Sequence, residues 1–255
     1  MVIKTLQWNI GGGRVRKPGA DIDLLASYCH DGLREIIELI KEVNPDIISL
    51  QETHKNKSQD QVQTIAKAVG LKYYVSDTYA DSHVEPGQKL GQGIISRFEI
   101  SNHDFQLFYN PHFQVVWEDG SIAVSHDKGV TSCEIDIDDT KIALKTLHMI
   151  PFRRFGVDPL SKEAEMVLND VQTKLKGNHD RLLIQGDFNF DQESLMAILP
   201  SLFARGVKEI SQKQPTTPKG RKYDHIIYKG LTLTESNTVK DVLTDHYPVV
   251  SEFQL

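Results

Sequence analysis

Short apolar runs enriched in valine and isoleucine alternate with polar segments along the chain, and each has the length of a β-strand. The pattern predicts strands at Val2–Ile10, Ile47–Leu50, Tyr73–Val75, Gly93–Ser96, Val130–Ile135, Ile142–His148, Leu182–Gln185, His225–Tyr228 and Val249–Phe253. Strands in the middle follow one another like hairpins, whereas helical segments separate those near both ends. This mixed order favours two packed sheets covered by helices over a repeated βαβ barrel.

Three other stretches carry apolar residues at helical spacing. They are Asp31–Val43, Gln59–Val69 and Lys162–Lys174. Pro45 closes the first helix, because a residue that precedes proline is pushed out of helical geometry. Residues 77–92 and 205–222 are rich in Gly, Pro, Lys and Gln, which predicts surface loops that carry specificity.

Length and composition favour one folded unit. The chain has 255 residues, 39% of them hydrophobic, and no linker or internal repeat divides it. We therefore expect a single domain over residues 1–255, acting as a monomer. The net charge of −6 supplies no global attraction to nucleic acid or to an anionic membrane, so any polyanion must be bound locally.

Targeting signals are absent from the N-terminal residues, and no run of about 18 apolar residues predicts a transmembrane helix. We expect a cytoplasmic protein, or a secreted one if a signal peptide has been removed. The two cysteines, Cys29 and Cys133, are too few for a disulfide framework. Free thiols are the simpler interpretation, and a single disulfide stays open.

Polar residues gather at the ends of the predicted strands, as acids, amides and imidazoles. Each alone has an ordinary explanation, such as a turn, a helix cap or a structural histidine. Together they indicate one site, because strands that end at a common edge bring such side chains together. The eight candidates are Asn9, Glu52, His148, Asp187, Asn189, Asp224, Asp245 and His246.

The motifs around these residues resemble those of the endonuclease/exonuclease/phosphatase superfamily, which includes deoxyribonuclease I, apurinic endonucleases, deadenylases, sphingomyelinases and inositol-polyphosphate phosphatases. WNI, LQE, GIISRF, LHMIP, GDFN, YDHI and DHYPV occur in the superfamily's order and span nearly the whole chain. The resemblance implies an α/β (α+β) four-layer sandwich, with two mixed β-sheets packed face to face and helices on the outside. This agrees with the predicted order of strands and helices.

The resemblance also implies roles for the eight residues. Glu52 would be the principal ligand of Mg²⁺, for which Mn²⁺ could substitute, with Asn9 and Asp245 beside it. His246 is the candidate general base with Asp224 as its partner, although Asp187 could equally activate the water. Asn189 can donate to phosphate without adding negative charge.

The residue type at position 148 differs between branches of the superfamily, and this chain has His148. Apurinic endonucleases tend to have tyrosine at the matching loop, whereas deoxyribonuclease I, sphingomyelinases and many phosphatases have histidine. The chain therefore departs from the abasic-site pattern. An imidazolium at this place can bind phosphate or protonate the leaving oxygen.

Three further residues are candidates for contacting substrate. His54 lies two residues beyond Glu52, and an exposed loop histidine is an equal alternative. Arg153 and Arg154 follow the LHMIP motif, where they could form a phosphate clamp or a solvated basic pair.

We therefore expect a Mg²⁺-dependent phosphodiesterase that cleaves DNA or RNA by in-line attack of water. The alternative is a small-substrate phosphoesterase acting on a phospholipid headgroup, a sugar phosphate or an inositol phosphate. A lipid enzyme should expose an aromatic hairpin, and residues Phe105–Val116 contain several aromatics. A catalytically dead binding protein is disfavoured by the complete set of site residues.

Overall fold

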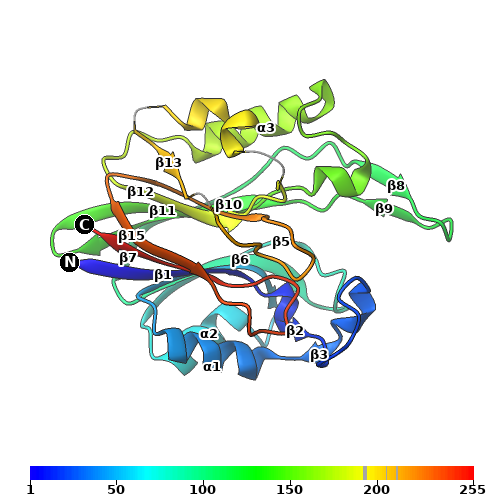
Figure 1. Cartoon of the computed structure of the whole chain (residues 1–255), viewed down its shortest axis with the longest axis horizontal. Coiled ribbons are helices and arrows are strands. Elements are labelled where there is room, and N and C mark those ends of the chain that lie inside the picture. The colour runs from blue at the N-terminus through cyan, green and yellow to red at the C-terminus, as the bar shows by residue number, and fades with distance from the viewer. Residues whose placement is uncertain (192–193, 205, 211) are drawn as a thin grey trace.

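Two six-stranded sheets lie face to face in the middle of the computed structural model, which describes residues 1–191, 194–204, 206–210 and 212–255 (Figure 1). The first sheet has the strand order β15 (Thr232–Thr238), β16 (Val249–Gln254), β1 (Val2–Asn9), β4 (Ile47–Lys55), β6 (Lys89–Ser96) and β5 (Tyr73–Asp81). The second has the order β13 (Lys208–Glu209), β14 (Asp224–Lys229), β12 (Leu182–Asp187), β11 (Thr140–His148), β10 (Gly129–Ile137) and β7 (Glu99–Leu107). The pairs β1–β4 and β11–β12 are parallel, so both sheets are mixed.

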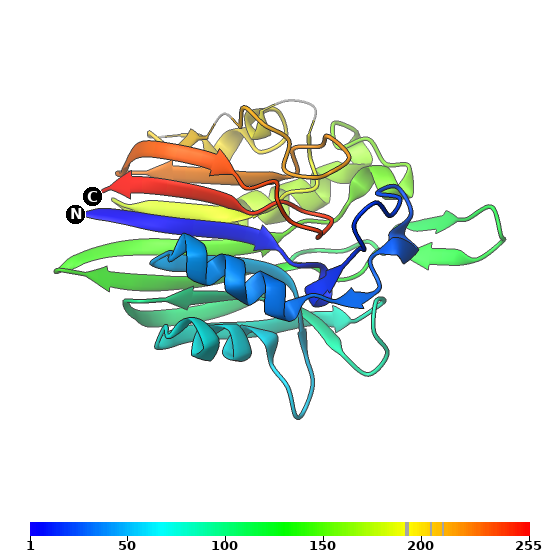
Figure 2. The ribbon, with the colours of Figure 1, turned by 60° about the horizontal axis from the view of Figure 1, so that its bottom comes forward.

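Helices cover the outer face of each sheet (Figures 1 and 2). Helices α1 (Leu33–Val43) and α2 (Gln61–Val69) pack on the first sheet, and α3 (Lys162–Leu175) packs on the second with the short turns η4 (Leu195–Ala197) and η5 (Pro200–Leu202). Asn44 ends α1 in the left-handed conformation directly before Pro45. The predicted four-layer sandwich is confirmed.

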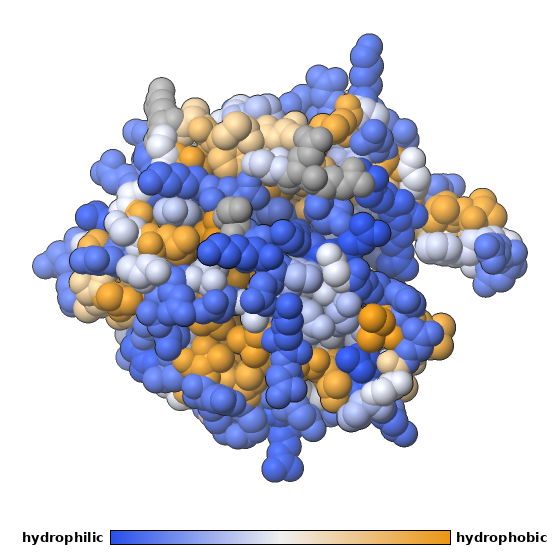
Figure 3. Space-filling model, in the orientation of Figure 1, coloured by the Kyte–Doolittle hydropathy of each residue, from blue (hydrophilic) through white to orange (hydrophobic). Residues whose placement is uncertain are grey.

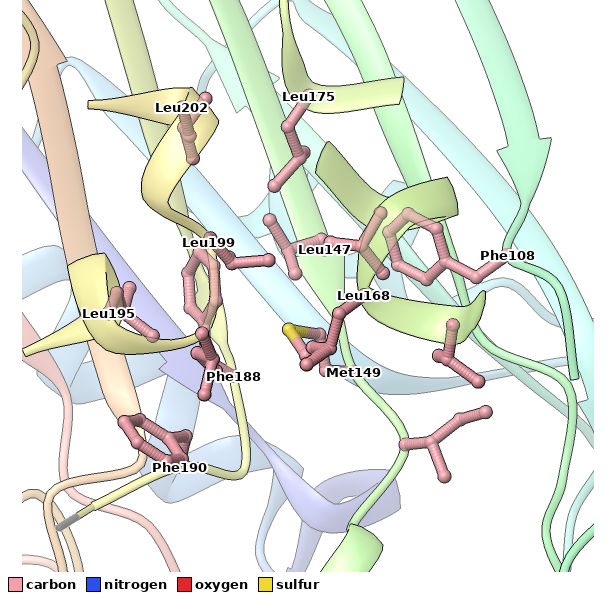
Figure 4. Close-up of a cluster of buried hydrophobic side chains, with 14 of the residues drawn as sticks. Phe108, Leu147, Met149, Leu168, Leu175, Phe188, Phe190, Leu195, Leu199 and Leu202 are labelled. Carbon is pink, nitrogen blue, oxygen red and sulfur yellow. The ribbon is translucent and has the colours of Figure 1, made fainter. Parts of the chain in front are cut away.

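The apolar layer under α3 holds the ends of β11 and β12, which carry residues of the candidate site. Leu147 and Met149 flank His148, and Phe188 follows Asp187. All three apolar side chains are fully buried in this layer, which Figure 4 shows together with Leu168 from α3. Because side chains alternate across a strand, burying these neighbours directs His148 and Asp187 to the opposite side, between the sheets.

The layer between the sheets changes character along the strands. Its far end, where β1 begins, is apolar, and its middle carries hydroxyl and amide side chains. Its near end, where β1 finishes at Asn9, carries acids, amides and imidazoles. The sequence of inward positions is Ile3, Thr5, Gln7 and Asn9 on β1, Ile142, Leu144, Thr146 and His148 on β11, and Leu183, Gln185 and Asp187 on β12.

Hydrogen bonds join the two sheets across the middle band. The side-chain amide of Gln7 donates to Gln51 Oε1 at 2.7 Å, and that of Gln51 donates to Thr146 Oγ1 at 2.7 Å. Such pairing offsets the cost of burying polar groups. The band therefore supports the near end from beneath.

The surface loop predicted over residues 77–92 is shorter in the structure and covers only residues 82–88. Strand β5 runs to Asp81 and β6 begins at Lys89. The glycines there allow close strand contact: a Cβ at Gly91 would lie 2.1 Å from the Asp77 carbonyl oxygen. In the predicted loop 205–222, β13 forms at Lys208–Glu209, and residues 205 and 211 lie outside the described part.

Each of the nine predicted strands overlaps an observed strand, but several strands were not predicted. Strands β7 and β15 lie at sheet edges and bury few side chains, so they form no apolar run. The short pair β2 (Arg14–Val15) and β3 (His30–Asp31), and the turns η1 (Gly11–Gly13), η2 (Leu25–Ser27) and η3 (Phe152–Phe155), were also not predicted.

A hairpin of β8 (Gln114–Val116) and β9 (Ile122–Val124) projects from the edge of the molecule where β1 and β11 end (Figures 1 and 2). Figure 3 shows apolar surface on it. Within the described ranges, no helix combines the length and apolar character needed to cross a membrane. Cys29 is exposed and Cys133 is buried, and both are free thiols.

Candidate functional site

The predicted residues meet at one edge of the sandwich. Asn9 and His148 are the last residues of β1 and β11, and Asp187 is the last residue of β12. Asp224 opens β14 directly opposite Asp187, because these two strands are antiparallel. Asp245 and His246 lie in the segment before β16.

Asp187 is the centre of the cluster. The side-chain amide of Asn9 donates to its Oδ2 at 3.0 Å, and the Nε2 atoms of His148 and His246 lie 3.4 and 3.6 Å from the same oxygen. The backbone N–H of Asn189 donates to Oδ1 at 2.9 Å. Burial and the nearby charge of Asp224 raise the pKa of Asp187 to about 6, against the opposing charge of His246.

His246 is held by a second carboxylate. Its Nδ1 lies 2.8 Å from Asp224 Oδ2, and Gln7 donates to the other Asp224 oxygen at 2.9 Å. Burial disfavours the imidazolium, but the carboxylates of Asp224 and Asp187 outweigh it and hold the pKa of His246 well above its usual value. The predicted His246–Asp224 contact is therefore present in the structure.

Glu52 reaches the cluster through a β-bulge. The register of β4 against β6 shifts between Gln51 and Thr53, and Glu52 has a φ of 51°. A bulge redirects a side chain that regular alternation would point away from the site. Burial raises the pKa of Glu52, but the charge of Lys128 and the surrounding imidazoles outweigh it, Lys128 most strongly, and lower the pKa to about 2.

Lys128 and Tyr79 join the site without any signal in the sequence. Lys128 Nζ is buried 3.6 Å from Glu52 Oε1 and 3.0 Å from His148 Nδ1, and the Tyr79 hydroxyl is 3.3 Å from the same Nδ1. Lys128 precedes a strand, where a charge is usually solvated, and Tyr79 lies in the part of the predicted loop that forms β5.

The lysine fixes the state of His148. An ammonium group only donates, so Nδ1 accepts and the ring proton of His148 lies on Nε2, toward Asp187. Burial and the charge of Lys128 hold the pKa of His148 well below its usual value. The geometry thus favours a neutral imidazole over the imidazolium expected from the sequence.

Asp245 provides a test of whether these residues suit a metal ion. The residue is half-buried, its Oδ1 is buried without a hydrogen-bond partner, and desolvation with the charge of Glu52 raises its pKa. In the described residues, no three His, Cys, Asp or Glu side chains form a complete metal cage. Mg²⁺ typically keeps several waters and takes one or two carboxylates. Glu52, Asp245 and the Asn9 amide fit that donor set.

The three weaker candidates have different surroundings. His54 is buried behind the glycine turn, where its Nε2 lies 2.8 Å from Ser82 Oγ. Arg154 stacks over Trp117, while the charge of Arg153 acts on Tyr223. The two arginines thus face different neighbours, and contact of any of the three with substrate stays a prediction.

A family profile identifies the family of this chain. The profile of the Endonuclease/Exonuclease/phosphatase family matches residues 6–246. The chain belongs to this family. Family membership supports phosphoester hydrolysis, and enzymes of the family generally use divalent metals.

Among curated relatives, a UPF0294 protein of Vibrio campbellii is 27% identical over 118 residues, which cover 45% of this chain and 40% of the relative. A UPF0294 protein of Vibrio vulnificus is 29% identical over 122 residues, covering 46% and 41%. The matched region thus spans less than half the length of these relatives.

Solved structures of the family share the fold. The endonuclease/exonuclease/phosphatase of Beutenbergia cavernae has a TM-score of 0.73 at 15% identity, covering 100% of this chain and 72% of that one. The family protein of Leptotrichia buccalis has a TM-score of 0.70 at 16% identity, covering 99% and 100%. D. rerio TDP2, complexed with a single-strand DNA product, has a TM-score of 0.63 at 16% identity, covering 100% and 99%. At these identities the likeness shows the fold alone.

Proposed function

We propose that the protein is a Mg²⁺-dependent phosphodiesterase that hydrolyses nucleic acid by in-line attack of water. The observation that carries the proposal is the surrounding of Asp187, whose Oδ2 has Asn9, His148 and His246 within 3.6 Å. A buried carboxylate with two imidazoles can place both a nucleophile and an anionic phosphate.

Glu52 and Asp245, with Asn9 beside them, would hold the metal ion. When bound, the ion would neutralise charge on the non-bridging phosphate oxygens. The unpartnered Oδ1 of Asp245 supports this assignment, since a buried carboxylate oxygen without a donor is costly unless a cation meets it.

Proton transfer falls to a hydrogen-bonded unit of Asp187, His246 and Asp224. The attacking water would lose its proton to this unit, and Asp224 would keep the His246 ring oriented from behind. His148 presents Nε2–H toward Asp187 and can donate to a phosphate oxygen there. Lys128 holds that tautomer and adds positive charge beside Glu52.

Structural likeness to a DNA-bound protein supports a polymeric substrate, whereas the net charge of this chain opposes it. The D. rerio neighbour is complexed with single-strand DNA, whereas this chain has a net charge of −6. One observation favours the second candidate, a phospholipid headgroup: Val116 and Ile122 on the projecting hairpin are 66% and 64% exposed.

The proposal is tested by a turnover panel of a bis-aryl phosphate, plasmid DNA, single-stranded RNA and sphingomyelin, with Mg²⁺ or EDTA. We expect Mg²⁺-dependent cleavage of the bis-aryl phosphate and a nucleic acid, and a loss of about 10²–10⁴-fold in His246→Ala. The matched control is His103→Ala, because His103 forms an exposed pair with Asp77 at the same 2.8 Å.

Three results would contradict the proposal. One is turnover that persists in EDTA, and another is an equal effect of the two histidine substitutions. Cleavage of sphingomyelin alone would replace the nucleic acid with the lipid headgroup.

A further inference from the structure

Two histidines outside the carboxylate cluster stack on each other at the edge of the site. The rings of His83 and His126 have centroids 5.1 Å apart and planes inclined by 20°. His83 lies in the loop between β5 and β6, and His126 lies between β9 and β10. Both residues are exposed, so the stack presents an aromatic surface to solvent.

This stack adjoins the proposed catalytic centre. Although both residues keep exposed surface, partial loss of hydration lowers the pKa of both imidazoles, and the charges of Lys128 and Arg154 lower both further, against the opposing charge of Glu52. The chain places both rings beside the cluster, because His83 follows Ser82, which contacts His54, and His126 lies two residues before Lys128, whose Nζ is 3.6 Å from Glu52 Oε1. At neutral pH the rings are uncharged aromatic faces.

The surface continues outward to the β8–β9 hairpin. Arg154 Cζ lies 5.6 Å from the centre of the Trp117 ring, and Trp117 is 40% exposed. At the base of the hairpin, Phe113 meets Phe152 edge to face with centroids 6.0 Å apart. These two contacts join the hairpin to η3. We call His83, His126, Arg154 and Trp117 the aromatic rim.

The chemistry of the rim selects among ligands. A metal ion is a poor fit, because in the described part of the chain no third His, Cys, Asp or Glu completes a metal-binding group with the stacked pair. Glu118 and Asp119 form the hairpin tip, and their charge opposes entry into an anionic membrane. Flat aromatic faces interrupted by a guanidinium suit a chain that alternates planar bases with phosphates.

Building on the proposed function, we propose that the aromatic rim binds the bases of a single-stranded nucleic acid whose scissile phosphate lies at Asp187. A single strand can turn its bases outward onto the rim, whereas duplex bases are already paired and stacked. Arg154 would meet the phosphates between the stacked bases.

Binding is measured in EDTA, so that the test does not depend on turnover. The chain has two tryptophans, and Trp8 is 1% exposed, so a base can reach only Trp117. We expect a short oligothymidylate to quench the tryptophan emission. Trp117→Phe should lose the quenching but keep most of the affinity, because phenylalanine also stacks.

Affinity is then compared by the anisotropy of a labelled oligothymidylate. Trp117→Ala and His126→Ala should each weaken binding by about 5- to 150-fold. The control His103→Ala should bind like the wild type, since His103 lies away from the rim on β7. Far-UV circular dichroism checks that each variant is folded.

Several outcomes would overturn the proposal: no quenching, equal affinity for a duplex of the same sequence, or unchanged affinity in both alanine variants. An emission shift with sphingomyelin–phosphatidylcholine vesicles and none with oligothymidylate would assign the rim to a lipid surface. Quenching without bis-aryl phosphate turnover contradicts only the proposed function. Turnover without oligonucleotide binding contradicts only the rim.

Discussion

The two ends of the layer between the sheets come from the same strands but carry opposite kinds of side chain. At the far end Ile3, Ile142 and Leu183 are fully buried and stabilise the fold by removing apolar surface from water. At the near end Asn9, His148 and Asp187 finish the same strands. The far end therefore supplies stability, while the near end holds buried charge that a cation and a substrate can relieve.

A substitution in the far end alone should lower stability and leave activity unchanged, which distinguishes the two ends. Ile142→Ala removes a buried side chain from the inter-sheet core, so we expect a loss of about 2–5 kcal/mol in the free energy of unfolding. Urea unfolding measures this loss. The specific activity of the folded protein should change little, because the residue lies far along β11 from His148.

A large fall in the activity of folded Ile142→Ala would show that the two ends are not independent. They would then be coupled through the amide and hydroxyl band. Thr238→Ala on the edge strand β15 serves as a control, since this residue is only half-buried and lies outside the apolar core.

A substitution at the near end should raise the melting temperature, whereas the substitution at the far end lowers stability. Burial and Glu52 raise the pKa of Asp245 above 3.8, so the folded state binds this proton more tightly than the unfolded state. Its contribution to stability is present below the unfolded pKa and is lost as the pH rises through the folded pKa. At pH 8 in EDTA, Asp245→Asn should therefore melt higher than the wild type, by about 2–4 °C for each kcal/mol relieved.

The same substitution should reduce any stabilisation by Mg²⁺, because it removes one of the ligands that we propose for the metal ion. Thermal melts with and without Mg²⁺, repeated at pH 4 and pH 8, measure both effects. Asp104→Asn, an exposed change of the same kind, is the control. A lower melting temperature for Asp245→Asn in EDTA would show that the carboxylate stabilises the empty site, contrary to the account.

The sequence pattern predicted the apolar residues of the far end and the strands that finish at the near end. Both follow from the alternation of side chains along a strand and from buried apolar runs. The four-layer fold and the contact between His246 and Asp224 are both present in the structure. Nothing local predicted Lys128, since its burial depends on Glu52, which is distant in the chain and reaches it through a bulge. Edge strands such as β7 bury too little apolar surface to form an apolar run, and the β8–β9 hairpin meets the rest of the fold through a contact between residues distant in the chain, Trp117 and Arg154.

We propose that the near end is a metal-dependent centre for phosphoester hydrolysis with Asp187 in the middle. This proposal is tested most directly by the rate at which Asp187→Asn hydrolyses a bis-aryl phosphate at saturating Mg²⁺, compared with wild type. We expect the rate to fall by about 10²–10⁴-fold in a protein that remains folded. A rate within about threefold of wild type, too small a change for loss of a proton-transfer group, would contradict it.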